Sequence, residues 1–342
     1  MVDTQLVNTR SGRIEPVPSS VPGRPVFAAL DLGTNNCRLL IARAQGAGFR
    51  VIDAFSRIVR LGEGLSRSDR LSERAVERAL AALRVCEAKI QRRGVTAIRA
   101  VATEACRRAV NCDDFLEQVG RETGIALEII SSAEEGRLAL AGCSPLLDPD
   151  LPRALVFDIG GGSTEIMWLE LVGGGRPPRL IDQVSLRHGV VSLAEQFGGT
   201  EIDGDTYDLM VETVADAIEP FDRRNGIRSA VERGGAQMLG TSGTVTTLAG
   251  VNLGLVRYER SLIDGSHLSV DHARLVTRHL MDMDYHQRAA HPCIGHDRAD
   301  LVMAGCAVLE AICNAWPFER LRIADRGLRE GILADFVGNL RS

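Results

Sequence analysis

The chain has 342 residues, of which 45% are hydrophobic and 25% charged, and its formal net charge at pH 7 is −5. This length exceeds what one hydrophobic core usually organises, so two domains of ordinary soluble composition are expected. The acidic balance excludes a generally polyanion-binding surface. Lys89 is the only lysine, which excludes a P-loop kinase motif because that motif needs a lysine after its glycines.

Targeting signals and reactive cysteine pairs are not visible in the sequence. No apolar stretch approaches the roughly 20 residues that span a bilayer. The N-terminus lacks the basic and apolar segments of a secretory signal. Eight cysteines are scattered without a C-x-x-C pair, which is typical of free, buried thiols. We therefore expect a cytoplasmic protein with no membrane and no nucleic-acid partner.

The first part of the chain alternates strands and helices, which is typical of an α/β domain. Residues 1–25 are rich in Pro, Ser, Gly and Arg and are expected to form a flexible tail. Apolar runs and helical spacing then predict, in order, strands over 26–31, 37–43 and 49–59, a helix over 71–93 capped by Ser72, a strand over 97–102, a helix over 113–122 and a strand over 127–130. Residues 26–144 would form domain I.

A second unit follows a proline-rich break. Residues 145–152 (PLLDPDLP) are expected to be a linker, because three prolines and two aspartates interrupt any regular pattern. Beyond it the pattern predicts strands over 155–158 and 165–171, and helices over 205–220, 244–251, 269–283, 298–314 and 327–340. Residues 153–342 would form domain II, whose last helix, about 327–340, could pack back on domain I.

The two halves begin alike. LDLGTNNCR (30–38) aligns without a gap with FDIGGGSTE (157–165), which places Asp31 on Asp158 and Gly33 on Gly160. An apolar residue separates the acid from the glycine each time. We favour an internal duplication over a chance likeness of two strand–turn–strand starts.

Glycine loops are the feature that bears most directly on function. A glycine turn between strands can be a plain hairpin, or it can expose backbone N–H groups that bind an anion, phosphate above all. Three such loops occur, and the third precedes a helix start, which also favours an anion. The candidate phosphate-binding residues are Asp31, Gly33, Thr34, Asn35, Gly160, Gly161, Gly162, Ser163, Thr164, Gly240, Thr241, Ser242, Gly243 and Thr244.

Charged residues accompany these loops. Asp158 ends a strand before its loop and Glu165 lies across the turn, so the two could hold Mg²⁺, which takes oxygen ligands. Glu134 and Glu135 open a predicted helix, where acids often complement the helix dipole, whereas a hydrolase needs a base for an attacking water. Arg107 follows a predicted strand and offers a fork to phosphate oxygens.

Taken together, these stretches resemble the exopolyphosphatase / guanosine pentaphosphate phosphohydrolase family, within the actin-like and sugar-kinase-like ATPase superfold. The likeness rests on AALDLGTNNCRLLIAR, ATEACRRAVN, EIISSAEEGRLALAG, VFDIGGGSTEIM, GTSGTVTTLAG, HDRADLVMAGCAVLEAI and ADRGLREGIL, which lie between residues 28 and 333. It implies an α/β fold of two ribonuclease-H-like domains around a central cleft. The chain resembles the short members, which have no C-terminal HD-type domain.

The resemblance implies an exopolyphosphatase that removes the terminal phosphate of inorganic polyphosphate, with the 5'-γ-phosphate of guanosine pentaphosphate (pppGpp) as a further substrate. It makes Glu135 the base that activates water, and Asp158 and Glu165 the acids that organise Mg²⁺, or Mn²⁺ in its place, and water. Arg107 becomes a phosphate-binding arginine. A homodimer is a further expectation. An actin-superfold ATPase or kinase, and a non-catalytic polyphosphate or alarmone sensor, remain as alternatives.

Overall fold

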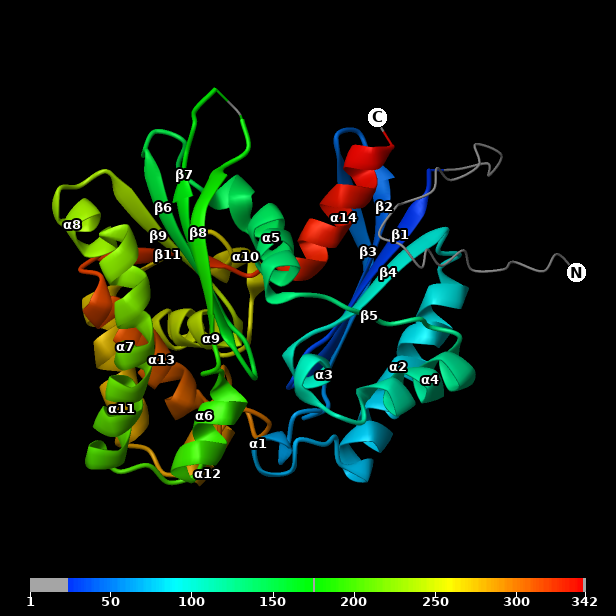
Figure 1. The fold of residues 1–342 in the computed structure, drawn as a ribbon, viewed down its shortest axis with the longest axis horizontal. Helices are drawn as coiled ribbons and strands as arrows, with labels where there is room; N and C mark the ends of the chain where they lie inside the picture. The colour runs from blue at the N-terminus through cyan, green and yellow to red at the C-terminus, as the bar shows by residue number, and fades with distance from the viewer. Residues whose placement is uncertain (1–23, 175, 341–342) are drawn as a thin grey trace, which may run out of the picture. The chain divides into compact units, whose positions relative to one another are not determined.

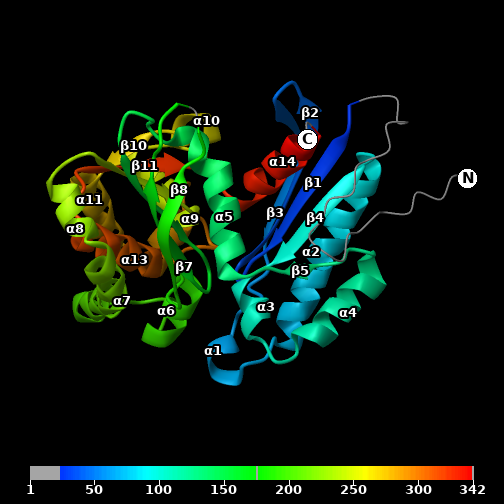
Figure 2. The same cartoon turned by 45° about the horizontal axis from the view of Figure 1, so that its top comes forward.

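The computed structural model describes residues 24–174 and 176–340. These residues fall into two compact units: unit 1 extends to Gly142 and resumes at Gly327, and unit 2 runs from Cys143 to Arg326. Each unit is built on its own β-sheet (Figure 1; Figure 2). The tail expected over 1–25 lies, up to residue 23, outside the described residues.

Unit 1 carries a five-stranded sheet in the order β3-β2-β1-β4-β5. β1 pairs antiparallel with β2 and parallel with β4, so a hairpin is followed by a crossover. Each strand that the sequence predicted in this half is present, with its ends within two residues of the expected ones. The strands are β1 Val26–Leu32, β2 Asn36–Gln45, β3 Gly48–Ile58, β4 Ala97–Ala102 and β5 Glu128–Ile129.

Helices cover both faces of the unit 1 sheet. They are α1 Leu65–Ser68, α2 Glu73–Arg92, α3 Glu104–Arg108, α4 Cys112–Thr123, α5 Ser132–Cys143 and α14 Leu328–Asn339. Successive side chains of a strand point to opposite faces. Ala28 and Leu30 of β1 accordingly join a core with α2 and α4, whereas Phe27 joins a core with α14, where its ring stacks on that of Phe336 at 4.9 Å. The last helix of the chain therefore packs on unit 1 (Figure 1).

Helix α2 shows how the sequence specifies these elements. Ser72 accepts a hydrogen bond from the Ala75 N–H at 3.3 Å, which satisfies one of the free donors of the first turn. Buried residues such as Ala79, Leu83 and Cys86 recur every three or four positions and form one apolar face. The helix predicted over 71–93, with its cap, is confirmed.

Unit 2 carries a six-stranded sheet in the order β10-β11-β9-β6-β7-β8. β6 pairs antiparallel with β7 and parallel with β9, and β9 pairs parallel with β11. The run β8-β7-β6-β9-β11 thus repeats the strand order of unit 1, and β10 adds an edge. The strands are β6 Arg153–Ile159, β7 Thr164–Glu170, β8 Arg179–Leu186, β9 Ala236–Thr241, β10 His267–Ser269 and β11 Arg320–Ala324.

The repeated strand order gives each unit a ribonuclease-H-like fold, as the family resemblance implied. The two hairpins also share one register: Asp31 lies opposite Arg38 in unit 1, and Asp158 lies opposite Glu165 in unit 2. Corresponding members of these pairs are the residues that the gapless alignment of the two sequence stretches superposes. The strand pairing therefore supports the internal duplication inferred from those stretches.

The helices of unit 2 share one large core with its sheet, in which Trp316 and Phe221 are fully buried. They are α6 Val190–Phe197, α7 Gly204–Asn225, α8 Ile227–Glu232, α9 Gly243–Asn252, α10 Arg260–Ile263, α11 Val270–Met281, α12 Tyr285–Ala290 and α13 Val302–Ala315. All eight cysteines of the chain are free and buried, as expected. No helix among the described residues is long and apolar enough to cross a membrane.

The segment 145–152, expected to be a linker, belongs to unit 2. The Asp148 N–H donates to Gln237 Oε1 at 2.8 Å, and Gln237 Nε2 donates back to the Asp148 carbonyl at 2.8 Å. Arg322 Nη1 donates to the Leu146 carbonyl at 2.6 Å. The prolines prevent regular structure here, but side chains of unit 2 satisfy the backbone and hold the segment in place.

Candidate active site

The hairpin loop of unit 1 connects β1 to β2. The Gly33 N–H donates to the Asn36 carbonyl at 2.8 Å, which closes the turn, and the Thr34 carbonyl accepts from the Gly62 N–H at 2.9 Å. Within residues 24–174 and 176–340, no acceptor meets the N–H groups of Thr34 and Asn35, and the buried Oδ1 of Asn35 has no partner. Carbonyls bound to the protein and unpaired N–H groups together make a concave donor site for an anion.

The hairpin loop of unit 2, between β6 and β7, repeats this arrangement. The Gly160 N–H donates to the Ser163 carbonyl at 2.9 Å, and the Gly160 carbonyl accepts from the Val190 N–H, at the start of α6, at 3.0 Å. In the described part of the chain, the N–H groups of Gly161, Gly162 and Ser163 meet no acceptor. These N–H groups are the donors that the sequence assigned to phosphate.

Each loop is pressed against a glycine from elsewhere in its own unit. A Cβ on Gly62 would lie 2.3 Å from Thr34 Cγ2, and a Cβ on Gly189 would lie 2.5 Å from the carbonyl carbon of Gly161. Gly62 follows Thr34 at the same spacing at which Gly189 follows Gly161. The duplication therefore extends beyond the hairpins. Around these two glycines the sequences are alike only in RLG at 60–62 and RHG at 187–189.

Three residues form a polar row across unit 2. Asp158, Glu165 and Ser185 lie opposite one another on β6, β7 and β8. Glu165 is buried, and its Oε1 accepts hydrogen bonds from Ser163 Oγ at 2.7 Å and from Ser185 Oγ at 2.8 Å. Such bonds fix the orientation of the carboxylate. The structure thus brings together the two predicted acids and adds Ser185, which sequence reasoning missed because strand pairing supplies it.

The oxygen donors of this row fit a hard cation. Mg²⁺ is usually bound by one or two carboxylates, with water and substrate phosphates at its other positions. Asp158 and Glu165 supply two carboxylates on adjacent strands. Among the described residues there is no group of three or more His, Cys, Asp or Glu side chains arranged as a self-sufficient metal cage. Asp158 and Glu165 therefore supply oxygen donors of the kind that Mg²⁺ or Mn²⁺ takes.

Several hydroxyls expected to bind phosphate are used inside the protein. Thr164 Oγ1 donates to the His188 carbonyl at 2.7 Å, and Thr241 Oγ1 donates to the Arg326 carbonyl at 2.8 Å. Ser163 donates to the buried acid of the polar row. Because a hydroxyl has a single proton to donate, the backbone N–H groups are the main donors that these loops offer.

The third predicted loop divides between a strand and a helix. Gly240 lies within β9 opposite Phe157, whose ring would be 2.5 Å from a Cβ, so this glycine serves packing rather than a loop. Ser242 caps α9 by accepting from the Thr244 N–H at 3.0 Å. Gly243 faces Arg298, whose guanidinium carbon would lie 3.7 Å from a Cβ there. Arg298, in the HDRAD stretch, is a cation beside the loop that sequence reasoning did not single out.

In unit 1, α5 places Glu135 next to Arg107. Arg107 Nη1 donates to Glu135 Oε2 at 2.8 Å, and Arg107 Nε donates to Glu104 Oε2 at 3.0 Å. Burial lowers the pKa of Arg107, but the two carboxylates outweigh this effect and the pKa is raised. The predicted base and the predicted arginine are therefore in contact. Glu104, within the ATEACRR stretch, is a further charged member that the sequence did not reveal.

Glu134 belongs to a different network. It accepts from Arg137 Nε at 2.7 Å and pairs with Arg99 at 2.9 Å, while Arg137 reaches Asp335 of α14 at 2.7 Å. The hydrogen bond from Arg137 lowers the pKa of Glu134, although burial opposes it. Glu134 thus ties α5 to β4 and α14, whereas Glu135 pairs with the candidate phosphate-binding arginine.

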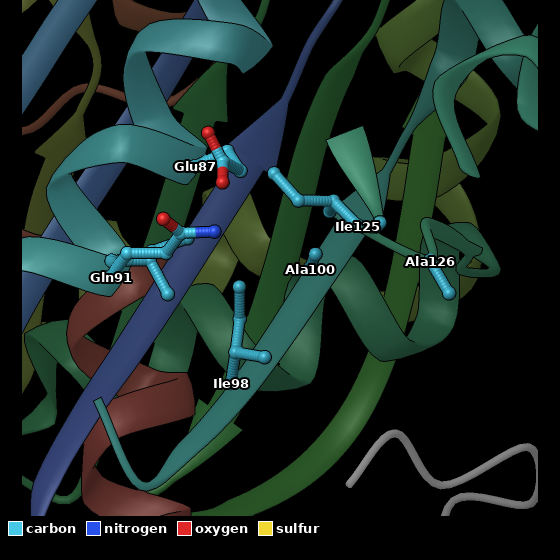
Figure 3. A pocket seen from close by; sticks show the side chains of 8 residues that line it. Glu87, Gln91, Ile98, Ala100, Ile125 and Ala126 are labelled. Atoms are coloured by element: carbon cyan, nitrogen blue, oxygen red, sulfur yellow. The ribbon is translucent and has the colours of Figure 1, made fainter. Parts of the chain in front are cut away.

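Figure 3 shows a pocket of unit 1 that does not suit a phosphate. It is formed by α2, β4 and the connection from α4 to β5 and is lined by Glu87, Ile90, Gln91, Ile98, Ala100, Gly124, Ile125 and Ala126. Apolar side chains dominate this lining, and its charged residue, Glu87, is an acid that would repel a polyanion.

Comparison with known proteins places this arrangement in a family. The model of the Ppx/GppA phosphatase family matches residues 40–340. The chain belongs to the Ppx/GppA phosphatase family. The resemblance noted in the sequence is thereby confirmed, and the duplicated units with their glycine loops are the scaffold of a Ppx/GppA-type hydrolase.

The relatives of this Ppx/GppA chain carry two kinds of name. A Haemophilus influenzae protein provisionally named exopolyphosphatase is 29% identical over 328 residues, which is 92% of each chain. The guanosine-5'-triphosphate,3'-diphosphate pyrophosphatase of Aeromonas hydrophila is 30% identical over 92% of this chain but only 60% of that protein. The crystal structure of an exopolyphosphatase-like protein has a TM-score of 0.82 at 28% identity and covers 92% of this chain and 99% of that one. An Aquifex aeolicus family member gives 0.75 at 27% identity, with 93% and 99% covered.

Proposed function

We propose that the chain is an exopolyphosphatase, which releases the terminal phosphate of inorganic polyphosphate, and that it acts on the 5'-γ-phosphate of pppGpp as a second substrate. The pairing of Glu135 with Arg107 carries this proposal, because it joins a carboxylate that can accept a proton to a guanidinium that can bind phosphate. The names of the Haemophilus and Aeromonas relatives support the two substrates.

Glu135 acts in this proposal as a general base. It removes a proton from a water whose oxygen attacks the terminal phosphorus in line with the bridging oxygen. A new P–O bond forms as the bond to the bridging oxygen breaks, and orthophosphate leaves the shortened chain. Arg107 stabilises the negative charge on the non-bridging oxygens. Such positioning and electrostatic stabilisation provide most of the catalysis in phosphoryl transfer.

The glycine hairpins bind phosphate oxygens through backbone N–H groups, those of Gly161 and Gly162 in unit 2 and those of Thr34 and Asn35 in unit 1. These donors need no side-chain rearrangement, because hydrogen bonds from the protein to the carbonyls of the same loops already hold the backbone in place. Each phosphate of a polyphosphate offers the same kind of oxygens, which backbone N–H donors bind.

Asp158 and Glu165 would hold Mg²⁺, for which Mn²⁺ could substitute. The chemistry that such a cation supplies when bound is neutralisation of phosphate charge. Ser163 and Ser185 orient the Glu165 carboxylate through their two hydrogen bonds. Both hydroxyls act on the same oxygen, so they set the direction in which the rest of the carboxylate faces.

The direct test is phosphate release with Mg²⁺ from polyphosphates of several lengths, pppGpp and ATP, measured side by side. Glu135→Gln should lower kcat by about 10² to 10⁴, the range of general acid–base catalysis, while substrate binding persists. Glu134→Gln is the matched control, because it alters a neighbouring acid whose partners are structural. It should retain turnover.

The alternatives give different outcomes in the same experiment. Phosphorylation of an acceptor that depends on Mg-ATP, or much tighter binding of ATP than of polyphosphate, would indicate an ATPase or kinase. Tight polyphosphate binding with no phosphate release by the wild-type chain would indicate a sensor. Near-normal turnover by Glu135→Gln would remove the base assignment even if polyphosphate is the substrate.

A further inference from the structure

Arg107 is shared between two carboxylates from different elements of unit 1. Its Nε donates to Glu104 on the same short helix, and its Nη1 donates to Glu135 of α5 at 2.8 Å and to the Ile130 carbonyl at 2.9 Å. The side chains are 17%, 12% and 14% exposed for Arg107, Glu104 and Glu135, so water screens these charges only weakly. One edge of the guanidinium thus belongs to Glu104 and the other to Glu135.

The third nitrogen of Arg107 is not satisfied. Nη2 lies 2.8 Å from Glu104 Oε2, yet outside hydrogen-bond geometry, and it is a buried donor without an acceptor among the described residues. A buried donor that makes no hydrogen bond destabilises the substrate-free protein. Nη2 is paired with Nη1 on the edge that meets Glu135, and two parallel N–H donors are the arrangement that binds a phosphate bidentately.

Two carboxylates, those of Glu104 and Glu135, contact the single guanidinium of Arg107. A phosphate that binds both Nη1 and Nη2 of Arg107 must displace Glu135 from Nη1. Glu104 Oε2 lies on the Nε side of the guanidinium, 3.0 Å from Nε and 2.8 Å from Nη2, whereas Glu135 occupies the Nη1 position that a bidentate phosphate would take.

We propose that Glu104 is a positioning residue, which anchors Arg107 through Nε while the Nη1–Nη2 edge passes from Glu135 to a substrate phosphate. Substrate binding then releases the Glu135 carboxylate from its ion pair at the moment when it is needed as a base. The inference rests on the proposed function, since it takes Arg107 as a phosphate-binding residue and Glu135 as the base.

Removal of the Glu104 charge should weaken this exchange in two ways. Without its anchor, Arg107 is held only by Glu135 and the Ile130 carbonyl. The remaining pair has no competitor, so the phosphate displaces Glu135 less readily and kcat falls, and KM rises because the guanidinium is less well placed. Loss of one charged hydrogen bond corresponds to about a tenfold or larger decrease in kcat/KM.

The test is a double-mutant cycle on phosphate release from polyphosphate. Glu104→Gln and Arg107→Ala should each lower kcat/KM, and the double variant should match Arg107→Ala to within about twofold, because Glu104 acts through Arg107. Glu104→Asp keeps the charge and should recover part of the loss. Glu117→Gln, an exposed acid on α4, is the control and should behave as wild type.

The outcomes separate this inference from the proposed function. The positioning role is wrong, while the function stands, if Glu104→Gln is as active as wild type. The same holds if the decrease in kcat/KM of the double variant equals the product of the decreases in the two single variants. If Arg107→Ala itself is unimpaired, the assignment of phosphate binding to Arg107 fails. Should Glu104→Gln not fold by circular dichroism, Glu104→Ala replaces it in the cycle with Arg107→Ala, and wild-type kcat and KM for a folded Glu104→Ala would overturn the inference.

Discussion

The hairpins of the two units share a backbone and differ in charge. Each turn is closed by a glycine N–H that donates to the carbonyl three residues on, at 2.8 Å in unit 1 and 2.9 Å in unit 2. Each leaves N–H groups without an acceptor among the described residues, and each packs against a glycine that follows it at the same spacing in the sequence. The residue opposite the strand aspartate is Arg38 in unit 1 but Glu165 in unit 2.

This difference shows how the two copies of a duplicated hairpin can acquire different functions. Backbone N–H groups beside an aspartate and an arginine can hold a phosphate without any metal ion. In unit 2, the two carboxylates beside the same kind of N–H groups repel a phosphate unless a cation lies between the carboxylates and the phosphate. Under the proposed function, both hairpins bind phosphate, and the unit 2 hairpin, through its two acids, also takes part in the chemistry.

The largest expected effect comes from changing the residue that distinguishes the hairpins. Glu165→Gln should lower kcat for phosphate release by about 10² or more, as expected when a charge that organises a reacting phosphate is lost. Arg38→Gln should act mainly on KM, raising it about tenfold with a smaller change in kcat. Steady-state kinetics with polyphosphate at saturating Mg²⁺ separate the two. Equal losses of kcat in both variants would contradict a division of tasks.

The second effect concerns the packing that the hairpins share. A Cβ on Gly189 would meet backbone atoms of Gly161 and Gly162 at 2.5 to 2.6 Å, whereas a Cβ on Gly62 would meet most closely the methyl end of Thr34. Gly189→Ala should therefore reduce the free energy of unfolding by about 2–3 kcal/mol, and Gly62→Ala by about 1 kcal/mol, because a side chain can move aside more cheaply than a backbone.

Urea denaturation of both variants measures this contrast. Gly48→Ala is the control, since a Cβ there would meet no atom within 4 Å. The prediction fails if Gly62→Ala proves the more damaging of the two. A parallel loss of activity in Gly189→Ala alone would further indicate that the shape of the unit 2 loop matters for turnover.

Much of this architecture could be predicted from the sequence, because local patterns determine it. The apolar runs that end in Asp31 and Asp158, each followed by a glycine turn, predicted both hairpins and their equivalence. Contacts between distant segments were not visible. Ser185 and Glu165 are 20 residues apart and meet only because β7 and β8 pair, and Glu104 meets Glu135 through Arg107.

One confirmed expectation and one difference have physical causes. The sequence allowed the last helix to pack back on domain I, and it does, because β1 buries residues on both faces and Phe336 of α14 covers the face that carries Phe27. The sequence also assigned Gly240 to a loop, because glycine is usually a turn residue. In the structure this glycine is in a strand, where the ring of Phe157 needs the space.

The smallest expected effect tests the charge at the unit 1 hairpin. Burial raises the pKa of Asp31 above its ordinary value of 3.8, although Arg38 and Arg329 oppose this. A folded-state pKa above the unfolded value means that ionisation of Asp31 costs stability at neutral pH. Asp31→Asn should therefore raise the Tm at pH 7. The gain should shrink as the pH falls through the folded pKa and vanish below 3.8.

Asp53→Asn in the same unit supplies a control of opposite sign. Hydrogen bonds from Lys89 and Arg93 hold the pKa of Asp53 well below 3.8, so its charge stabilises the fold above that pH. This variant should lower the Tm at pH 7, and its deficit should disappear as the pH falls below 3.8 and through the folded pKa.

If Asp31→Asn instead lowers the Tm at pH 7, the Asp31 carboxylate is stabilised by its arginines more than burial destabilises it. The unit 1 hairpin would then rely on that charge as the unit 2 hairpin relies on its acids, and the contrast between the two would narrow to Arg38 against Glu165.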